Sequence, residues 1–167
     1  MRRWALLLAV TLLVSGCAGR SAPPPATLSM TAPPWPAPRD AVANLALAGV
    51  PESRLDDRSN QHTLTLTVRL DGAPVPLPAW IGVDRLRAVQ GPAHTHDDSG
   101  VVWLEGRGAE QVTLGQFFTL WGVRFSRRCL GPACAAVRVV ADGITVTEPE
   151  PLRLASVRVI EISALTR

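Results

Sequence analysis

Apolar and polar side chains alternate most clearly at residues 63–70, where Leu and Val take turns with Thr and Arg. A period of two puts each set on one face of a strand, so the segment predicts a strand with one buried and one solvated face. The pair Asp71-Gly72 follows at once and favours a tight hairpin turn. Prolines alternate in the return segment at residues 75–78, and because they cannot donate ladder hydrogen bonds, we expect that strand at a sheet edge.

A second hairpin is predicted near the end of the chain, where Asp142-Gly143 joins apolar residues 137–140 to residues 144–146. Residues 157–162 then predict a closing strand. That segment is apolar at nearly every position, as is typical of a strand buried on both faces.

The apolar spacing changes to that of a helix between the two hairpins. Four large side chains follow the i, i+3, i+4, i+7 pattern of a buried helix face: Leu114, Phe117, Phe118 and Trp121. Thr113 and Gln116 have the spacing of a capping box, and Gly122 suits the left-handed residue that ends a helix. We interpret the aromatic stripe as core rather than as a ligand site. A shorter helix is predicted between Asp40 and Gly49.

In order, these elements predict an α+β domain over residues 41–167, with a mixed sheet of about five strands packed on one helix. The arrangement expected is β-grasp-like. A β-sandwich with one helix is the alternative.

The N-terminus has the features of an export signal. Arg2 and Arg3 precede an apolar stretch at residues 4–14, which is shorter than the roughly 20 residues of a membrane-spanning helix. Residues 13–17, Leu-Val-Ser-Gly-Cys, resemble the lipobox of bacterial lipoproteins. The resemblance implies that residues 1–16 are removed, that Cys17 receives a thioether lipid and an amide-linked acyl chain such as palmitate, and that the protein is held on the cell membrane or outer membrane, facing the periplasm or the exterior. An ordinary secretory signal is the alternative.

Residues 17–40 are expected to tether the domain to that lipid. Seven prolines between positions 20 and 40 favour extended polyproline II over helix or central strand. Trp35 lies within this segment. It is either a recognition anchor or a side chain that packs back on the domain.

Charge excludes one class of function. All 17 basic residues are Arg, and without Arg2 and Arg3 the 15 remaining nearly balance 14 acidic residues. Nucleic-acid binders carry a strong basic field, so we expect no nucleic-acid partner.

Cys129 and Cys134 are separated by a Leu-Gly-Pro-Ala turn. A disulfide is the expected state in an exported protein. Two thiolates that join a soft metal site are the alternative.

The candidate chemistry lies at His94, His96 and Asp97. If the segment is extended, both imidazoles point to one side, where they can bind Cu or Zn, with Asp97 as a further ligand or as an orienting group. The structural alternative is that the histidines bond to the backbone of the turn at residues 97–100. His62 is the remaining histidine, and nothing in the sequence brings it near.

The run His94-Thr95-His96-Asp97, with the helix motif Leu-Gly-Gln-Phe-Phe-Thr-Leu-Trp-Gly at residues 114–122, resembles a family of exported or membrane-attached bacterial proteins. The resemblance covers roughly residues 61–162 and brings no established activity. Relatives often carry extra histidines in the first strand, where this chain has Gln61, Thr63 and Thr65.

No catalytic motif is present, so no catalytic residue is assigned and the protein is not expected to be an enzyme. The sequence predicts a membrane-anchored lipoprotein with a binding or envelope role, no resident cofactor and an unidentified protein partner. The alternative is an extracytoplasmic Cu- or Zn-binding module that uses the His-x-His pair.

Overall fold

A computed structural model describes residues 25–167. The expected signal peptide and Cys17 lie outside the described residues. No helix within residues 25–167 has the length and apolar character needed to cross a membrane.

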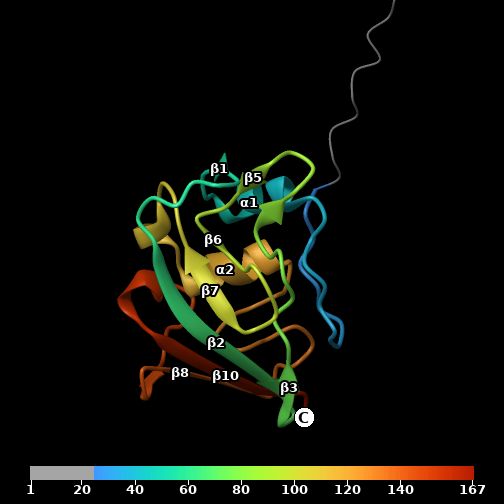
Figure 1. The fold of residues 1–167 in the computed structure, drawn as a ribbon. Helices are drawn as coiled ribbons and strands as arrows, with labels where there is room; N and C mark the ends of the chain where they lie inside the picture. Colours follow the sequence, from blue (N-terminus) through green and yellow to red (C-terminus); the bar gives the residue numbers. More distant parts are fainter. Residues whose placement is uncertain (1–24) are drawn as a thin grey trace, which may run out of the picture.

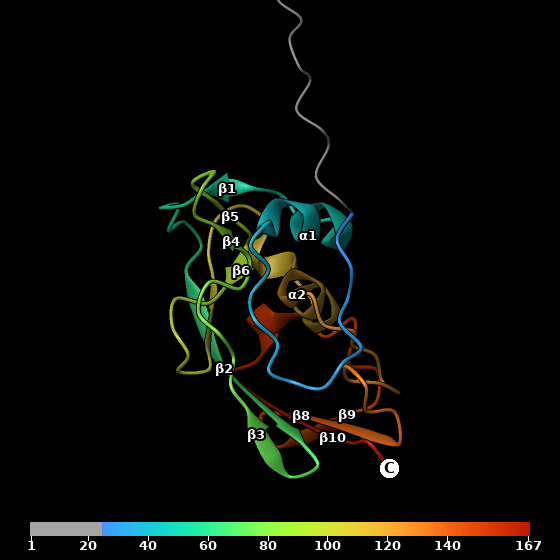
Figure 2. The same ribbon diagram turned by 90° about the vertical axis from the view of Figure 1, so that its right-hand side faces the viewer.

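The main sheet has seven strands (Figures 1 and 2). Their order is β6-β7-β2-β10-β8-β9, and β3 pairs with the end of β2. The strands are β2 (His62–Leu70), β3 (Ala73–Val75), β6 (Ala93–His94), β7 (Val101–Leu104), β8 (Ala136–Ala141), β9 (Ile144–Val146) and β10 (Val159–Leu165).

The topology confirms the predicted α+β class and its β-grasp-like order. Hairpin β2–β3 is followed by helix α2 (Leu114–Trp121) and hairpin β8–β9, and β10 returns between the hairpins, parallel to β2. Helices rather than a second large sheet complete the core, so the β-sandwich alternative does not describe the chain.

The strand count exceeds the expected five for two reasons. Hairpin β6–β7 extends the sheet along the first half of β2, where β7 pairs with residues 62–65. A separate small sheet joins β1 (Ser53–Arg54), β5 (Val89–Gln90) and β4 (Val83–Asp84). Short 3-10 turns, η1 (Ala109–Gln111) and η2 (Leu154–Ser156), complete the elements.

One face of the main sheet is buried and the other is open. The alternation predicted for β2 is confirmed, because its Leu and Val side chains are buried and its Thr side chains from Thr65 on are exposed. The same alternation holds in β10, where Ile160 and Ile162 are buried and Val159 and Glu161 are exposed. The prediction that the closing strand is buried on both faces is therefore wrong, since the helices pack on one face only.

Both predicted helices form, with the predicted caps. In α2 the Thr113 hydroxyl accepts from the Gln116 backbone N–H, and the Gln116 side chain accepts from the Thr113 N–H. Helix α1 (Ala41–Ala48) begins at Asp40, ends at a left-handed Gly49, and packs on α2 (Figure 2). The aromatic side chains of α2 are fully buried, which confirms their predicted role as core.

Part of the proline-rich segment lies on the domain. The Ser29 N–H donates to the Gly122 carbonyl, and the Trp121 indole N–H donates to the Trp35 carbonyl. Trp35 is 3% exposed and meets Trp121 edge to face, with ring centroids 5.6 Å apart. Trp35 thus packs back on the domain rather than standing free as an anchor.

The predicted disulfide joins Cys129 and Cys134, whose Cα atoms are 4.2 Å apart. Its loop contains Gly131, and a Cβ atom built there would lie 2.5 Å from the Trp35 ring. The loop therefore forms one wall of the Trp35 pocket, and the two sulfurs are not free to ligate a metal.

Candidate metal centre

Hairpin β6–β7 brings three potential metal ligands together. His94 ends β6 and pairs with Trp103 of β7, so their side chains share a face of the sheet. Glu105 lies two residues beyond Trp103, and His96 lies two residues beyond His94. His96 and Glu105 lie just beyond the ends of β6 and β7, and one donor atom from each lies close to a donor atom of His94.

The donor atoms of this cluster are close to one another. His94 Nε2 is 3.2 Å from His96 Nε2 and 3.3 Å from Glu105 Oε2. One ligand atom from each of the three residues fits within a 4.8 Å span. That spacing suits three ligands around one ion, since Zn–N and Zn–O bonds are about 2.0–2.2 Å long.

His94 is held in the tautomer that a metal ligand needs. Its Nδ1 is 3.0 Å from the Gly91 carbonyl oxygen, which can only accept, so Nδ1 carries the hydrogen. In the neutral ring Nε2 then has a free lone pair that points at the cluster. Metal-binding histidines usually have an outer partner of this kind on the second nitrogen.

Burial favours that neutral ring. His94 is 1% exposed, and desolvation lowers its pKa below the ordinary value of 6.5, although the Gly91 bond and the nearby Glu105 charge act in the opposite direction. With His94 neutral, its Nε2 can accept the Nε2–H of His96 at 3.2 Å or bind a metal ion, and Glu105 Oε2 lies 3.3 Å from the same nitrogen.

Glu105 is buried, and a hydrogen bond to its Oε1 orients the carboxylate. The carboxylate is 3% exposed, and Oε1 accepts from the side-chain amide of Gln61, just before β2. Oε2 is left facing His94. Gln61 therefore contacts the cluster through Glu105.

Thr95 fixes the backbone between the two histidines. It is fully buried, and its hydroxyl donates to the Pro78 carbonyl and accepts from the Ile81 N–H, at 2.7 and 3.0 Å. These bonds tie the segment to residues 78–81, so the two rings are positioned by the fold.

One side of the cluster is accessible to solvent. His96 is exposed, and its ring packs on Trp103, with centroids 5.0 Å apart. Two histidines and one carboxylate leave a fourth tetrahedral position for water or an exogenous ligand.

The remaining predicted residues lie elsewhere. Asp97 is exposed, and its Oδ1 accepts from the Ser99 hydroxyl and backbone N–H, bonds that lower the pKa of Asp97. The structure thus places Glu105, not Asp97, beside the two imidazoles. His62 Nε2 lies 3.5 Å from the Val157 carbonyl, away from the cluster.

The structural alternative expected the histidines to bond to the backbone of the turn at residues 97–100. His94 instead bonds to the backbone carbonyl of Gly91. The missed ligand, Glu105, had one signal in the sequence. It is an acidic residue directly after the apolar run 101–104, and a hairpin centred on residues 97–100 places it two residues beyond Trp103, the partner of His94, on the same face as His94.

In comparisons with known proteins, no family model, no curated protein and no solved structure matches the chain.

Proposed function

We propose that this protein is an extracytoplasmic metal-binding module, held to a membrane by lipid at Cys17, that binds Cu(II) or Zn(II) through His94, His96 and Glu105. The observation that carries the proposal is the convergence of His94 Nε2, His96 Nε2 and Glu105 Oε2, of which His94 Nε2 lies 3.2 Å from His96 Nε2 and 3.3 Å from Glu105 Oε2.

The donor set supports the choice of ion. Two imidazole nitrogens and one carboxylate oxygen suit Zn(II) and Cu(II), whereas Cu(I) prefers thiolate or thioether sulfur and Mg²⁺ or Ca²⁺ prefer oxygen alone. The sulfurs of Cys129 and Cys134 are joined to each other. A soft-metal site with those cysteines is thereby excluded.

The openness of the site supports binding and transfer rather than a structural role. Structural zinc sites are closed by four protein ligands, whereas this cluster offers three, one of them exposed. The extensive hydrophobic core is built from other residues than the three ligands, which supports a fold that forms without a metal. We infer that the module acquires an ion and passes it on.

Trp103 supplies a direct test, because its indole contacts His96. Cu(II) bound at the cluster should quench the fluorescence of Trp103, and Zn(II) should compete with it. Tag-free protein is titrated with Cu(II), Zn(II) and Cu(I), and Trp103→Phe identifies the reporting indole.

His96→Ala is the most informative variant. It removes one metal ligand, and because His96 is exposed it leaves no cavity in the core. We expect its Cu(II) affinity to fall at least about tenfold, as loss of even an outer-shell partner costs that much. His62→Ala removes a histidine that lies outside the cluster and is the matched control. Binding no tighter than micromolar, or equal affinity in both variants, would exclude the proposed site.

A further inference from the structure

The turn between β4 and β5 presents an apolar side chain to solvent. Leu86 lies in this turn and is 96% exposed, the largest exposure among the big apolar residues described. A leucine so placed contributes nothing to the core, which raises the question of what it contacts.

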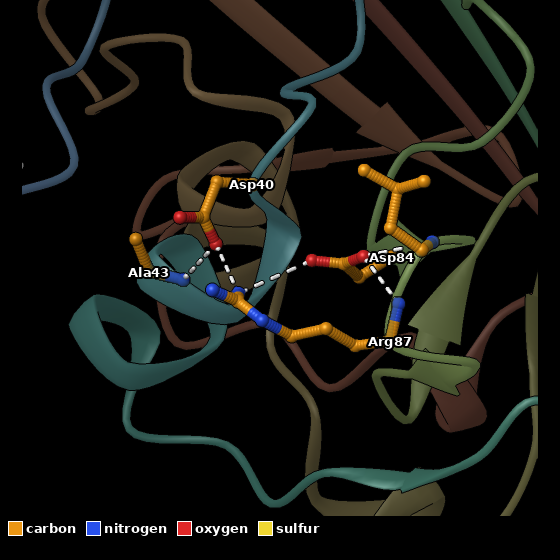
Figure 3. A network of polar contacts seen from close by, with 5 residues as sticks. Asp40, Ala43, Asp84 and Arg87 are labelled. Carbon is orange, nitrogen blue, oxygen red and sulfur yellow. Dashed lines mark hydrogen bonds and ion pairs between the residues drawn. The ribbon is translucent and has the colours of Figure 1, made fainter. Parts of the chain in front are cut away.

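A polar network holds this turn in place (Figure 3). Asp84 Oδ1 accepts from the backbone N–H groups of Leu86 and Arg87, at 3.1 and 3.0 Å. The Arg87 guanidinium then bridges Asp84 Oδ2 at 3.3 Å and Asp40 Oδ1 at 2.7 Å. Asp40 also caps α1. These bonds connect the turn to the N-terminus of α1. The backbone of the turn is therefore held in the conformation that exposes Leu86.

Trp80 is held beside this turn in an unfavourable backbone conformation. Its φ is +71°, in a region that non-glycine residues rarely occupy, and its ring is 40% exposed. The Trp80 N–H donates to the Thr95 carbonyl at 3.0 Å, and the Arg85 guanidinium lies 4.8 Å from the ring centroid. Backbone strain of this kind persists where the surroundings impose it, and it is concentrated at functional positions.

Arginines surround the two apolar side chains. Arg39, Trp80, Arg85 and Leu86, here called the Trp80 face, line a hollow of about 560 Å³ together with Pro38. Among residues 25–167, neither Arg39 nor Arg85 has a carboxylate within ion-pairing distance. The face thus combines the indole of Trp80, the side chain of Leu86 and two arginines that have no carboxylate partner among the described residues. That combination is typical of side chains placed at the headgroup level of a bilayer.

The segment that leads from the start of the described chain into α1 borders this face. Pro25 and Pro38 line one hollow, and Pro38 also lines the hollow of the Trp80 face. Cys17 lies eight positions before Pro25. Fully extended, this segment spans at most about 28 Å. A lipid at Cys17 would therefore keep the Trp80 face within reach of the bilayer surface.

We propose that the Trp80 face docks on the surface of an anionic phospholipid bilayer, with Trp80 and Leu86 entering the headgroup region and Arg39 and Arg85 contacting lipid phosphates. Each Arg near an anionic surface contributes about fivefold to the partition coefficient, which is too little for attachment alone but enough to orient an anchored domain. The Thr95 contact of Trp80 links this face to the strand of His94 and His96. Docking would hold the metal cluster at a fixed orientation to the membrane.

The proposal is tested with the protein isolated from membranes and reconstituted in vesicles that contain brominated acyl chains, which quench nearby indoles. In phosphatidylglycerol vesicles, wild-type fluorescence should be quenched. The quenched component should be absent in Trp80→Phe and reduced in Leu86→Asp. In pure phosphatidylcholine vesicles the quenching should be weaker, and Arg85→Glu should lower it in the anionic vesicles.

Ile144→Asp is the matched control. Ile144 is an apolar residue of β9, 72% exposed, at the opposite end of the molecule from the β4–β5 turn (Figure 2). Its substitution should leave quenching unchanged. Circular dichroism confirms that each variant is folded.

Two results would overturn the proposal. One is quenching that is absent in anionic vesicles or that Trp80→Phe does not alter. The other is a dimer seen by sedimentation that Leu86→Asp dissociates while quenching stays the same, since the face would then belong to a contact between two copies of the chain. Metal binding is measured separately, so failure of the bilayer contact leaves the Cu(II) titration as an independent result.

Discussion

Nε2 of His94 lies 3.3 Å from Oε2 of Glu105, and both side chains are almost completely buried. In the metal-free protein the neutral His94 ring can accept, at Nε2, the Nε2–H of His96, which lies 3.2 Å away. A bound ion would take the place of that hydrogen between the two rings.

Glu105→Gln should weaken metal binding without weakening the fold. The amide of Gln can donate a hydrogen to His94 Nε2, so the buried contact keeps a polar partner, but a neutral amide is a poor ligand for Zn(II) or Cu(II). We expect at least about a tenfold loss of Cu(II) affinity. The midpoint of urea unfolding of the metal-free protein should be equal or higher. Unchanged affinity would show that Glu105 is not a ligand.

Stability of the metal-free protein should fall as the pH is lowered below about 6.5. Burial lowers the pKa of His94 below 6.5 in the folded state, so between the folded and unfolded pKa values the unfolded chain binds more protons. The free energy of unfolding therefore rises with pH between the folded and unfolded pKa values of His94. Above the unfolded value, the ionisation of His94 no longer lowers it.

Urea unfolding at a series of pH values measures this effect. His94→Gln should flatten the profile in that window, while His62→Ala should retain it. If His94→Gln has the slope of the wild type, another group is responsible.

Phe117→Ala should be strongly destabilising. Phe117 is fully buried on the face of α2 that packs against the sheet, and truncating a buried Phe costs about 3–5 kcal/mol. Ile144→Ala, at a residue 72% exposed, should change the free energy of unfolding by less than about 0.5 kcal/mol. Guanidinium unfolding compares the two, and similar losses would place Phe117 outside the core.

Gly131→Ala should destabilise the protein more than Gly143→Ala. Both glycines have positive φ, +55° and +82°, so each alanine costs roughly 1–2 kcal/mol of backbone strain. Only at Gly131 would the new methyl group also meet a neighbour, the Trp35 ring at 2.5 Å, whereas nothing lies within 4 Å at Gly143.

The difference between the two melting temperatures therefore reports the Trp35 contact. In a Trp35→Ala background the additional cost at Gly131 should disappear. Equal melting temperatures in the wild-type background would mean that Trp35 does not pack on the disulfide loop.

Short-range patterns were sufficient for the two helices and for hairpins β2–β3 and β8–β9, but not for hairpin β6–β7 or the small sheet. Asp71-Gly72 and Asp142-Gly143 mark the two hairpins, and the Thr113–Gln116 capping box marks the start of α2, because the interactions that decide a turn or a cap lie within four residues. The order of these elements along the chain also indicated the β-grasp-like sheet. The disulfide followed from two cysteines five positions apart.

The site depended on pairings that no local pattern encodes. Asp97 follows His96 in sequence and Glu105 comes nine residues later, yet Glu105 is the carboxylate beside the rings. The reason is the register of β6 with β7, which sets His94 opposite Trp103. A shift of one residue in that register would turn Glu105 to the other face of the sheet.

The sequence by itself determined where the two helices, hairpins β2–β3 and β8–β9 and the covalent crosslink form, since each depends on neighbours along the chain. Only the tertiary structure decided that Glu105 faces His94, that Trp35 fills a pocket beside Gly131, and that one face of β10 stays open. Those outcomes depend on strand register and on which surfaces the two helices cover, and both are set by contacts between residues far apart in the chain.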